Sequence, residues 1–151
     1  MQLKVNTFRF RKKIAACDFD HTLICPTKDA TFSKNVDDWE WLTPQVPDIL
    51  KKYYQDGYCI MIFSNQMKKW KADQIQQCML LLEIPVLINV GYADEDRKPN
   101  AAMFLNAVNN KAWDKKKSFY CGDALGRKED WFDIPKESKD ESFPRKMPGN
   151  N

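Results

Sequence analysis

The stretch Cys17-Asp18-Phe19-Asp20-His21-Thr22-Leu23 places two carboxylates directly after a short apolar run, Ile14-Ala15-Ala16. This pattern predicts a buried β-strand that opens into a loop carrying Asp18 and Asp20. In open α/β sheets, ligands bind in the crevice beyond the carboxyl ends of the strands. Two aspartates there can divide the work of phosphoryl transfer, because one can attack phosphorus while the other moves a proton. The motif alone is short, and aspartates that end a strand or close a turn explain it equally well.

The composition is that of a globular domain. With 151 residues, of which 43% are hydrophobic and 13% aromatic, the chain is long enough for one domain with its own core. A net charge of +3 is compatible with a phosphate-bearing partner but does not require one. The sequence has neither a membrane-spanning segment nor the apolar core of a signal peptide. We therefore expect an intracellular protein, nuclear or cytoplasmic, without membrane attachment.

The cysteines and the histidine limit the kinds of metal site. Five cysteines, with no Cys-x-x-Cys pair, predict a reducing compartment and neither a disulfide framework nor a structural zinc. Cys17, Cys59 and Cys121 fall in apolar runs, where a thiol acts as a small hydrophobe. His21 is the only histidine, which excludes a histidine-rich metal site and any mechanism that needs two histidines.

Apolar runs alternate with helical periodicity along the chain. This alternation predicts a doubly wound, Rossmann-like α/β fold around a parallel sheet. The polar segment 26–38 is predicted to form a loop or a short flap over the strand ends. Buried strands are expected at 14–16, 58–63, 86–90 and 118–121, an edge strand within 3–10, and helices at 46–56, 72–83 and 100–111.

Each of the four buried strands is followed by polar residues of different chemistry. Taken singly, a Ser, Asn or Asp at such a place can cap a helix, and a lysine can simply be solvated. Because the carboxyl ends of parallel strands lie on one edge of the sheet, the four groups together predict a site. They are Asp18 and Asp20, then Ser64 and Asn65, then Arg97-Lys98-Pro99, and finally Gly122-Asp123.

The order Asp-x-Asp-x-Thr, Ser, Lys, Gly-Asp resembles the haloacid dehalogenase (HAD) superfamily of phosphotransferases. Within it, the sequence is similar to the 3′-phosphatase domains of polynucleotide kinases, over roughly residues 5 to 133. Asn65-Gln66 and the Gly-Asp-Ala-x-Gly-Arg piece favour this branch. The matching pieces are residues 18–24, 38–39, 56–58, 62–67, 97–99 and 121–127.

The resemblance implies an architecture and an activity. It implies a HAD-like domain over residues 1–135, with a small flap and no large cap domain, followed by an irregular charged tail over 136–151. It also implies a Mg²⁺-dependent phosphomonoester hydrolase that removes 3′-phosphates from DNA ends through an aspartyl-phosphate, in DNA end repair.

The resemblance assigns roles to four catalytic residues. Asp18 would be the nucleophile, and Asp20 would protonate the leaving hydroxyl and then activate the hydrolytic water. Ser64 and Lys98 would hold phosphoryl oxygens, and the lysine would also offset the repulsion between Asp18 and the phosphate.

The resemblance also implies a metal site and residues that support the substrate. Mg²⁺ takes oxygen ligands, here the carboxylate of Asp18, the backbone carbonyl of Asp20 and Asp123. Thr22, Asn65 and Arg127 would support substrate binding.

Three features depart from the family's pattern. Residues 67–71 replace a longer Gly-Arg-Gly loop. Their lysines could contact backbone phosphates and Trp70 could stack on a base, although solvation and packing are the commoner roles. The tail 136–151 does not resemble the family's last core elements, so the sheet is expected to be trimmed. No Gly-x-x-x-x-Gly-Lys-Ser/Thr motif is present, and a 5′-kinase activity is therefore not expected.

Two other functions compete with this interpretation. The first is a HAD phosphatase for a small metabolite, although such enzymes often carry a cysteine and histidine zinc loop that this sequence lacks. The second is a non-catalytic module that binds nucleic-acid ends. The presence of every chemical part of the site disfavours that module, because a decayed site need not keep them all.

Overall fold

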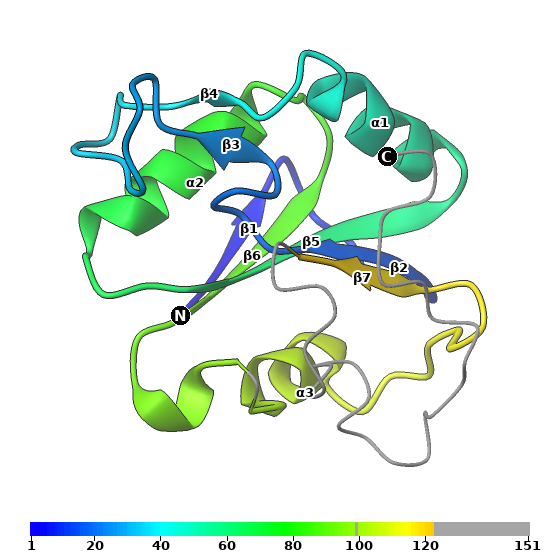
Figure 1. The fold of residues 1–151 in the computed structure, drawn as a ribbon. Helices are drawn as coiled ribbons and strands as arrows, with labels where there is room; N and C mark the ends of the chain where they lie inside the picture. The colour runs from blue at the N-terminus through cyan, green and yellow to red at the C-terminus, as the bar shows by residue number, and fades with distance from the viewer. Residues whose placement is uncertain (99, 123–151) are drawn as a thin grey trace.

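The computed structural model describes residues 1–98 and 100–122, which fold around a five-stranded sheet with helices on both faces (Figure 1). The strand order is β1-β6-β5-β2-β7, in which β1 is antiparallel to β6 and the other neighbours are parallel. The strands are β1 (Gln2–Val5), β2 (Lys13–Cys17), β5 (Tyr58–Asn65), β6 (Val86–Gly91) and β7 (Phe119–Cys121). The predicted α/β fold with a mostly parallel sheet is therefore confirmed.

The strand β5 shows why the sheet is buried on both sides. Its continuous apolar run is typical of a central parallel strand, because helices cover both faces of such sheets. Ile60 and Ile62 point into the core beneath α1 and α2, whereas Met61 and Phe63 point into the second core beneath α3. All four side chains are fully buried.

The helices α1 (Val46–Gln55) and α2 (Trp70–Leu80) cover one face of the sheet, and α3 (Ala102–Val108) covers the other (Figure 1). A short 3₁₀ turn, η1 (Asp94–Asp96), follows β6. A proline in the first turn starts α1, since proline is tolerated only there. Gly57, with φ of 97°, follows its last turn. No helix of the described residues is long and apolar enough to cross a bilayer.

A second, two-stranded antiparallel sheet forms the base of the flap, which we define as residues 26–38. Its strands are β3 (Ile24–Cys25) and β4 (Glu40–Trp41). Trp39 and Trp41 pack edge to face, with ring centroids 4.9 Å apart, and both lie against the main core. Ile24, at the other end of the flap, is fully buried in the same core. The flap is therefore anchored to the body of the domain at both of its ends.

Several element boundaries differ from the sequence-based expectations. The helix α2 begins at Trp70 instead of residue 72, and α3 is shorter than 100–111 because Asn109 adopts a left-handed conformation. The edge strand ends at Val5, since Asn6 and Thr7 have positive φ angles that break an extended chain. The small β3–β4 sheet was not predicted.

Buried thiols make the stability of this fold sensitive to alkaline pH. Burial raises the pKa of the Cys78 thiol from its ordinary value of 9.0 to about 12 and that of Cys59 to about 11. Between the ordinary thiol pKa of 9.0 and these raised pKa values, the unfolded chain loses protons that the folded chain keeps. The free energy of unfolding therefore falls as the pH rises above about 9.

We expect the urea midpoint, followed by tryptophan fluorescence, to fall between about pH 8.5 and pH 10.5. The fall should be smaller in Cys78→Ala, because this variant lacks one of the titrating thiols. Cys25→Ala, which removes a more exposed thiol, should keep most of the wild-type slope. Equal slopes for Cys78→Ala and the wild type would contradict this explanation.

Candidate active site

Asp18 lies at the carboxyl end of β2, in contact with a lysine from a distant part of the chain. Its Oδ1 is 3.1 Å from Lys98 Nζ and accepts a hydrogen bond of 2.8 Å from the Phe19 N–H. The Asp18 N–H donates to the carbonyl of Cys121, which continues the β2–β7 pairing beyond the strand. The Asp18 side chain is 18% exposed, so the carboxylate is fixed and still accessible.

Lys98 is held by residues of β5 and β7, the two strands that flank β2. Its N–H donates to Asn65 Oδ1 over 2.7 Å, and Asn65 Nδ2 donates to its carbonyl over 2.9 Å. The Lys98 ammonium donates to the Tyr120 hydroxyl over 2.7 Å. Asn65, at the end of β5, and Tyr120, on β7, thus place the positive charge of Lys98 beside Asp18.

Asp20 lies in the tight turn after β2 and has a different set of partners. Its Oδ1 is 2.5 Å from Lys71 Nζ, and its Oδ2 accepts a hydrogen bond of 2.8 Å from Gln66 Nε2. The second Nε2 hydrogen of Gln66 reaches Ser64 Oγ over 2.6 Å. His21 adopts a φ of 60°, which helps to reverse the chain in this turn. The two carboxylates therefore have separate cationic partners, Lys98 for Asp18 and Lys71 for Asp20.

The structure brings four of the predicted catalytic residues together at one edge of the sheet. Ser64 and Asn65 are consecutive on β5, and they connect to Asp20 through Gln66 and to Lys98 directly. Thr22 is buried, and its hydroxyl has no hydrogen-bond partner among the residues that the structure describes. Asp123, Arg127 and the predicted tail 136–151 lie outside the described residues.

Four residues of this network were not predicted from the sequence as site residues. Lys71 and Gln74 share the inward face of α2 with Ile75 and Cys78. A lysine at helical spacing from buried apolar residues is a signal that could have revealed the inward position of Lys71. The interpretation of residues 68–71 as solvated or phosphate-binding lysines is wrong for Lys71, which is 5% exposed. The other two are Gln66 and Tyr120.

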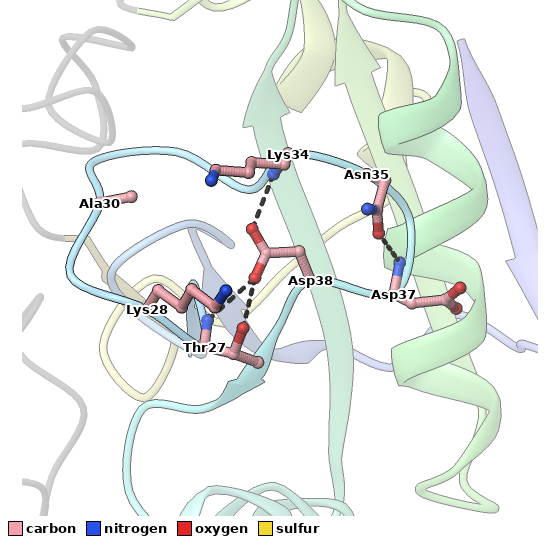
Figure 2. Close-up of a pocket in the computed structure, with 7 residues that line it drawn as sticks. All are labelled: Thr27, Lys28, Ala30, Lys34, Asn35, Asp37 and Asp38. Carbon is pink, nitrogen blue, oxygen red and sulfur yellow. Dashed lines mark hydrogen bonds between the residues drawn. The ribbon is translucent and has the colours of Figure 1, made fainter.

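The flap has its own internal network around one carboxylate. Asp38 accepts hydrogen bonds from the Thr27 hydroxyl, the Thr27 N–H and the Lys34 N–H (Figure 2). These bonds hold the pKa of Asp38 below its usual range. The residues around Asp38 line a hollow of about 270 Å³ that belongs to the flap itself. They are Thr27, Lys28, Ala30, Lys34, Asn35, Asp37 and Asp38.

Two side chains join the flap to the rest of the site. The His21 ring contacts the carbonyl of Thr31 through Nε2 at 2.6 Å, which requires the tautomer that carries the proton on Nε2. Gln74 Nε2 lies 3.3 Å from the carbonyl of Asn35 and 3.4 Å from that of Val36. The flap is therefore tied to the turn that carries Asp20 and to the inward face of α2.

Cys17, which precedes Asp18, is not available as a competing nucleophile. Burial raises the pKa of its thiol well above the ordinary value, and the thiolate is the reactive form of cysteine. A carboxylate, in contrast, can act as a nucleophile at neutral pH. Asp18 is therefore the candidate nucleophile at this strand end.

The oxygen donors of the site fit a hard divalent cation in part. The carboxylate of Asp18 and the backbone carbonyl of Asp20 are ligands of the kind that Mg²⁺ prefers. Among residues 1–98 and 100–122, no three His, Cys, Asp or Glu side chains are gathered closely enough to hold a metal by themselves. The donor set therefore needs an additional oxygen, and Asp123 is the predicted residue.

Asn65 is the residue whose loss should displace Lys98 most directly. We expect Asn65→Ala to lower the free energy of unfolding by about 1–3 kcal/mol, because two hydrogen bonds to partly buried backbone groups are lost. The rate of aryl phosphate hydrolysis should fall by about tenfold to a hundredfold, because Lys98 is no longer fixed beside Asp18.

The matched control is Asn106→Ala, an exposed position on α3. It should change neither urea stability nor the hydrolysis rate appreciably. If Asn65→Ala kept full activity while losing stability, the hydrogen bonds to Lys98 would serve only the fold.

The chain matches a family model described as polynucleotide kinase 3 phosphatase over residues 13–146. It is 36% identical over 136 residues to the bifunctional polynucleotide phosphatase/kinase of Schizosaccharomyces pombe, covering 82% of this chain and 33% of that protein. It is also 36% identical over 127 residues to an uncharacterized 20.8 kDa protein of Autographa californica nuclear polyhedrosis virus, covering 78% and 69%. The polynucleotide 3′-phosphatase ZDP of Arabidopsis thaliana is 29% identical over 149 residues, covering 81% and 21%.

The chain thus spans about a third of the length of the fission yeast protein. Among solved structures, a putative HAD-like phosphatase from Mesorhizobium loti aligns with a TM-score of 0.56 at 20% identity, covering 78% of this chain and 66% of that one. A chain of the Pnkp1/Rnl/Hen1 complex aligns with a TM-score of 0.54 at 18% identity, covering 92% and 48%. These structures share the fold, as expected for a HAD-like domain. From the family match over most of the sequence, the chain belongs to the polynucleotide kinase 3′-phosphatase family of HAD-like phosphomonoester hydrolases.

Proposed function

We propose that this protein is a Mg²⁺-dependent polynucleotide 3′-phosphatase that removes 3′-phosphates from DNA ends, with DNA end repair as its context. The observation that carries the proposal is the separation of the two carboxylates into different environments. Asp18 faces Lys98, whereas Asp20 is held by Lys71 and Gln66. Two carboxylates with different surroundings can take different roles in one reaction.

Asp18 is the proposed nucleophile. Its carboxylate attacks phosphorus, so that the bond from Asp18 to phosphorus forms while the bond from phosphorus to the 3′-oxygen breaks. Attack by an anion on a phosphate that is itself an anion needs nearby positive charge. Lys98 supplies that charge at 3.1 Å from Asp18 Oδ1.

Asp20 is the proposed acid and base. It gives a proton to the departing 3′-oxygen, which becomes the hydroxyl of the product, and then takes a proton from the water that hydrolyses the aspartyl-phosphate. The hydrogen bond of Gln66 to Asp20 Oδ2 orients this carboxylate. Ser64, which shares Gln66 with Asp20, is the proposed partner of a phosphoryl oxygen.

A bound Mg²⁺ would be held by Asp18, Asp20 and the predicted ligand Asp123, and it would neutralise phosphate charge and orient the phosphoryl group. The protein's own residues supply the remaining functions. Lys98 orients the phosphate next to the nucleophile, and the segment after β2 carries both carboxylates at the same edge of the sheet.

The surroundings of the site support a nucleic-acid end as the substrate. Phe32, in the flap next to the carbonyl that His21 contacts, is 69% exposed. An exposed aromatic ring beside a phosphate site offers a stacking face for a base. Lys68 and Lys69, just before α2, are exposed, and such lysines can contact backbone phosphates without reading sequence. The relatives named for polynucleotide ends support the same substrate class.

We expect phosphate release from an oligonucleotide with a 3′-phosphate and not from the same oligonucleotide with a 5′-phosphate. Release should require Mg²⁺ and should be lost with EDTA and in Asp18→Asn, because this variant has no carboxylate nucleophile. The measurement is release of inorganic phosphate, with p-nitrophenyl phosphate and a sugar phosphate run in parallel. Turnover of the sugar phosphate at least as fast as that of the oligonucleotide would favour a metabolite phosphatase.

Phe32→Ala separates recognition of the strand from the chemistry in the same assay. It should raise the KM for the 3′-phosphorylated oligonucleotide by about tenfold, which is the loss of affinity expected when one base is no longer stacked. Hydrolysis of p-nitrophenyl phosphate should stay close to wild type. Leu105→Ala removes another exposed apolar side chain, on α3 at the opposite face of the sheet, and should affect neither substrate. A KM unchanged by Phe32→Ala would remove the flap from substrate recognition.

A further inference from the structure

A continuous line of polar contacts joins the flap to Asp20 through the inward face of α2. Lys71 Nζ contacts Asp20 Oδ1 at 2.5 Å and Gln74 Oε1 at 2.7 Å. The amide nitrogen of Gln74 then reaches the backbone carbonyls of Asn35 and Val36. Figure 1 shows the loop between β3 and β4 lying alongside α2, in agreement with these contacts.

Burial makes this line of contacts costly to break at any point. Gln74 is fully buried and Lys71 is 5% exposed. A buried amide or ammonium that loses its partner keeps the full desolvation penalty. If the flap backbone moved away, Gln74 would lose both acceptors for its amide nitrogen. Gln74 could then reorient, and Lys71 would be the next group to lose its contact.

The helix itself provides a rigid base for the two side chains. Lys71 and Gln74 are three residues apart, so they lie on the same face of α2. Ile75 and Cys78, on the same face, are fully buried in the core. A shift of the flap is therefore taken up by the polar side chains and not by the helix, because a packed core resists deformation.

We propose that Lys71 and Gln74 are positioning residues that make the placement of the Asp20 carboxylate depend on the flap backbone at Asn35 and Val36. This inference rests on the proposed function in one respect, namely that Asp20 moves the proton. Lys98 and not Lys71 faces Asp18, so Lys71 acts on the acid and not on the nucleophile. A strand end that engages the flap would then bring Asp20 into its working position.

Gln74→Glu separates the two contacts of this residue. A glutamate keeps an oxygen toward Lys71 but cannot donate to the carbonyls of Asn35 and Val36. Gln77→Glu, at an exposed position of the same helix, makes the same change of charge and is the matched control. Lys71→Met, which keeps the length of the side chain without its charge, is the second variant in case Gln74→Glu fails to fold.

The first measurement is hydrogen exchange of the flap peptide, detected by mass spectrometry. Its reporters are the amides of Lys34 and Asp37, which are hydrogen-bonded inside the flap. Coupling is reciprocal, so Asp20→Asn should loosen the flap just as Gln74→Glu does. We expect exchange to be about fivefold faster in both variants, the lower end of usual coupling, and unchanged in Gln77→Glu.

The second measurement compares two leaving groups. Loss of a well-placed acid slows the release of an alkoxide, whereas a dinitrophenolate leaves without a proton. We expect Gln74→Glu to lower the single-turnover rate of product release from the 3′-phosphorylated oligonucleotide by about tenfold, and the single-turnover rate of dinitrophenolate release to fall far less. Single turnovers are needed because the hydrolysis of the aspartyl-phosphate, which Asp20 also assists, follows both of these steps. Lys71→Met should show the same pattern.

The outcomes decide the two proposals separately. Equal losses in the two single-turnover rates, or flap exchange unchanged by Asp20→Asn, would overturn the positioning role. If the wild type turned over dinitrophenyl phosphate but released nothing from the oligonucleotide, the proposed substrate would be wrong. The exchange measurement would still decide whether Asp20 and the flap are coupled, because it needs no turnover.

Discussion

Two carboxylate–lysine pairs at the end of one strand are the constraint on which the rest of this site depends. A buried strand that ends in two aspartates needs nearby positive charge, because a desolvated carboxylate without a partner is costly. Lys98 reaches Asp18 from the segment after β6, and Lys71 reaches Asp20 from the first turn of α2. The strand β5 lies between β2 and β6 in the sheet, and its end carries Asn65, which fixes Lys98. Assembly of the site therefore requires the central sheet to be complete.

Local sequence patterns were sufficient to predict the fold class and the central elements of the fold. Continuous apolar runs predicted β5 and β6, and the spacing of Ile75, Cys78, Met79 and Leu82 predicted the buried face of α2. What the patterns could not supply was long-range pairing. The antiparallel addition of β1 beside β6 and the short β3–β4 sheet depend on contacts between distant segments, and two-residue strands carry no periodicity.

The residues of the candidate site also fall into two groups, those that local sequence patterns predicted and those that only the structure revealed. Asp18, Asp20, Ser64 and Lys98 could be proposed because each lies at or after the carboxyl end of a strand that the sequence predicted. Lys71 escaped notice because the helix was expected to begin two residues later, which left Lys71 in a loop. Gln74 lay inside the expected helix, but it was not singled out there. Once α2 begins at Trp70, Lys71 falls one turn before Ile75 on the buried face. The functions of Asp123 and Arg127 remain predictions from the sequence, since both lie outside the described residues.

The central claim is that Asp18 becomes covalently phosphorylated. The most direct test is to quench the enzyme in acid during turnover of a 3′-phosphorylated oligonucleotide, reduce it with borohydride and sequence its peptides by mass spectrometry. An acyl phosphate is reduced whereas a free carboxylate is not, so we expect homoserine at position 18 and aspartate at position 20. Unmodified Asp18 under rapid turnover, or homoserine at position 20 instead, would contradict the assignment of the nucleophile.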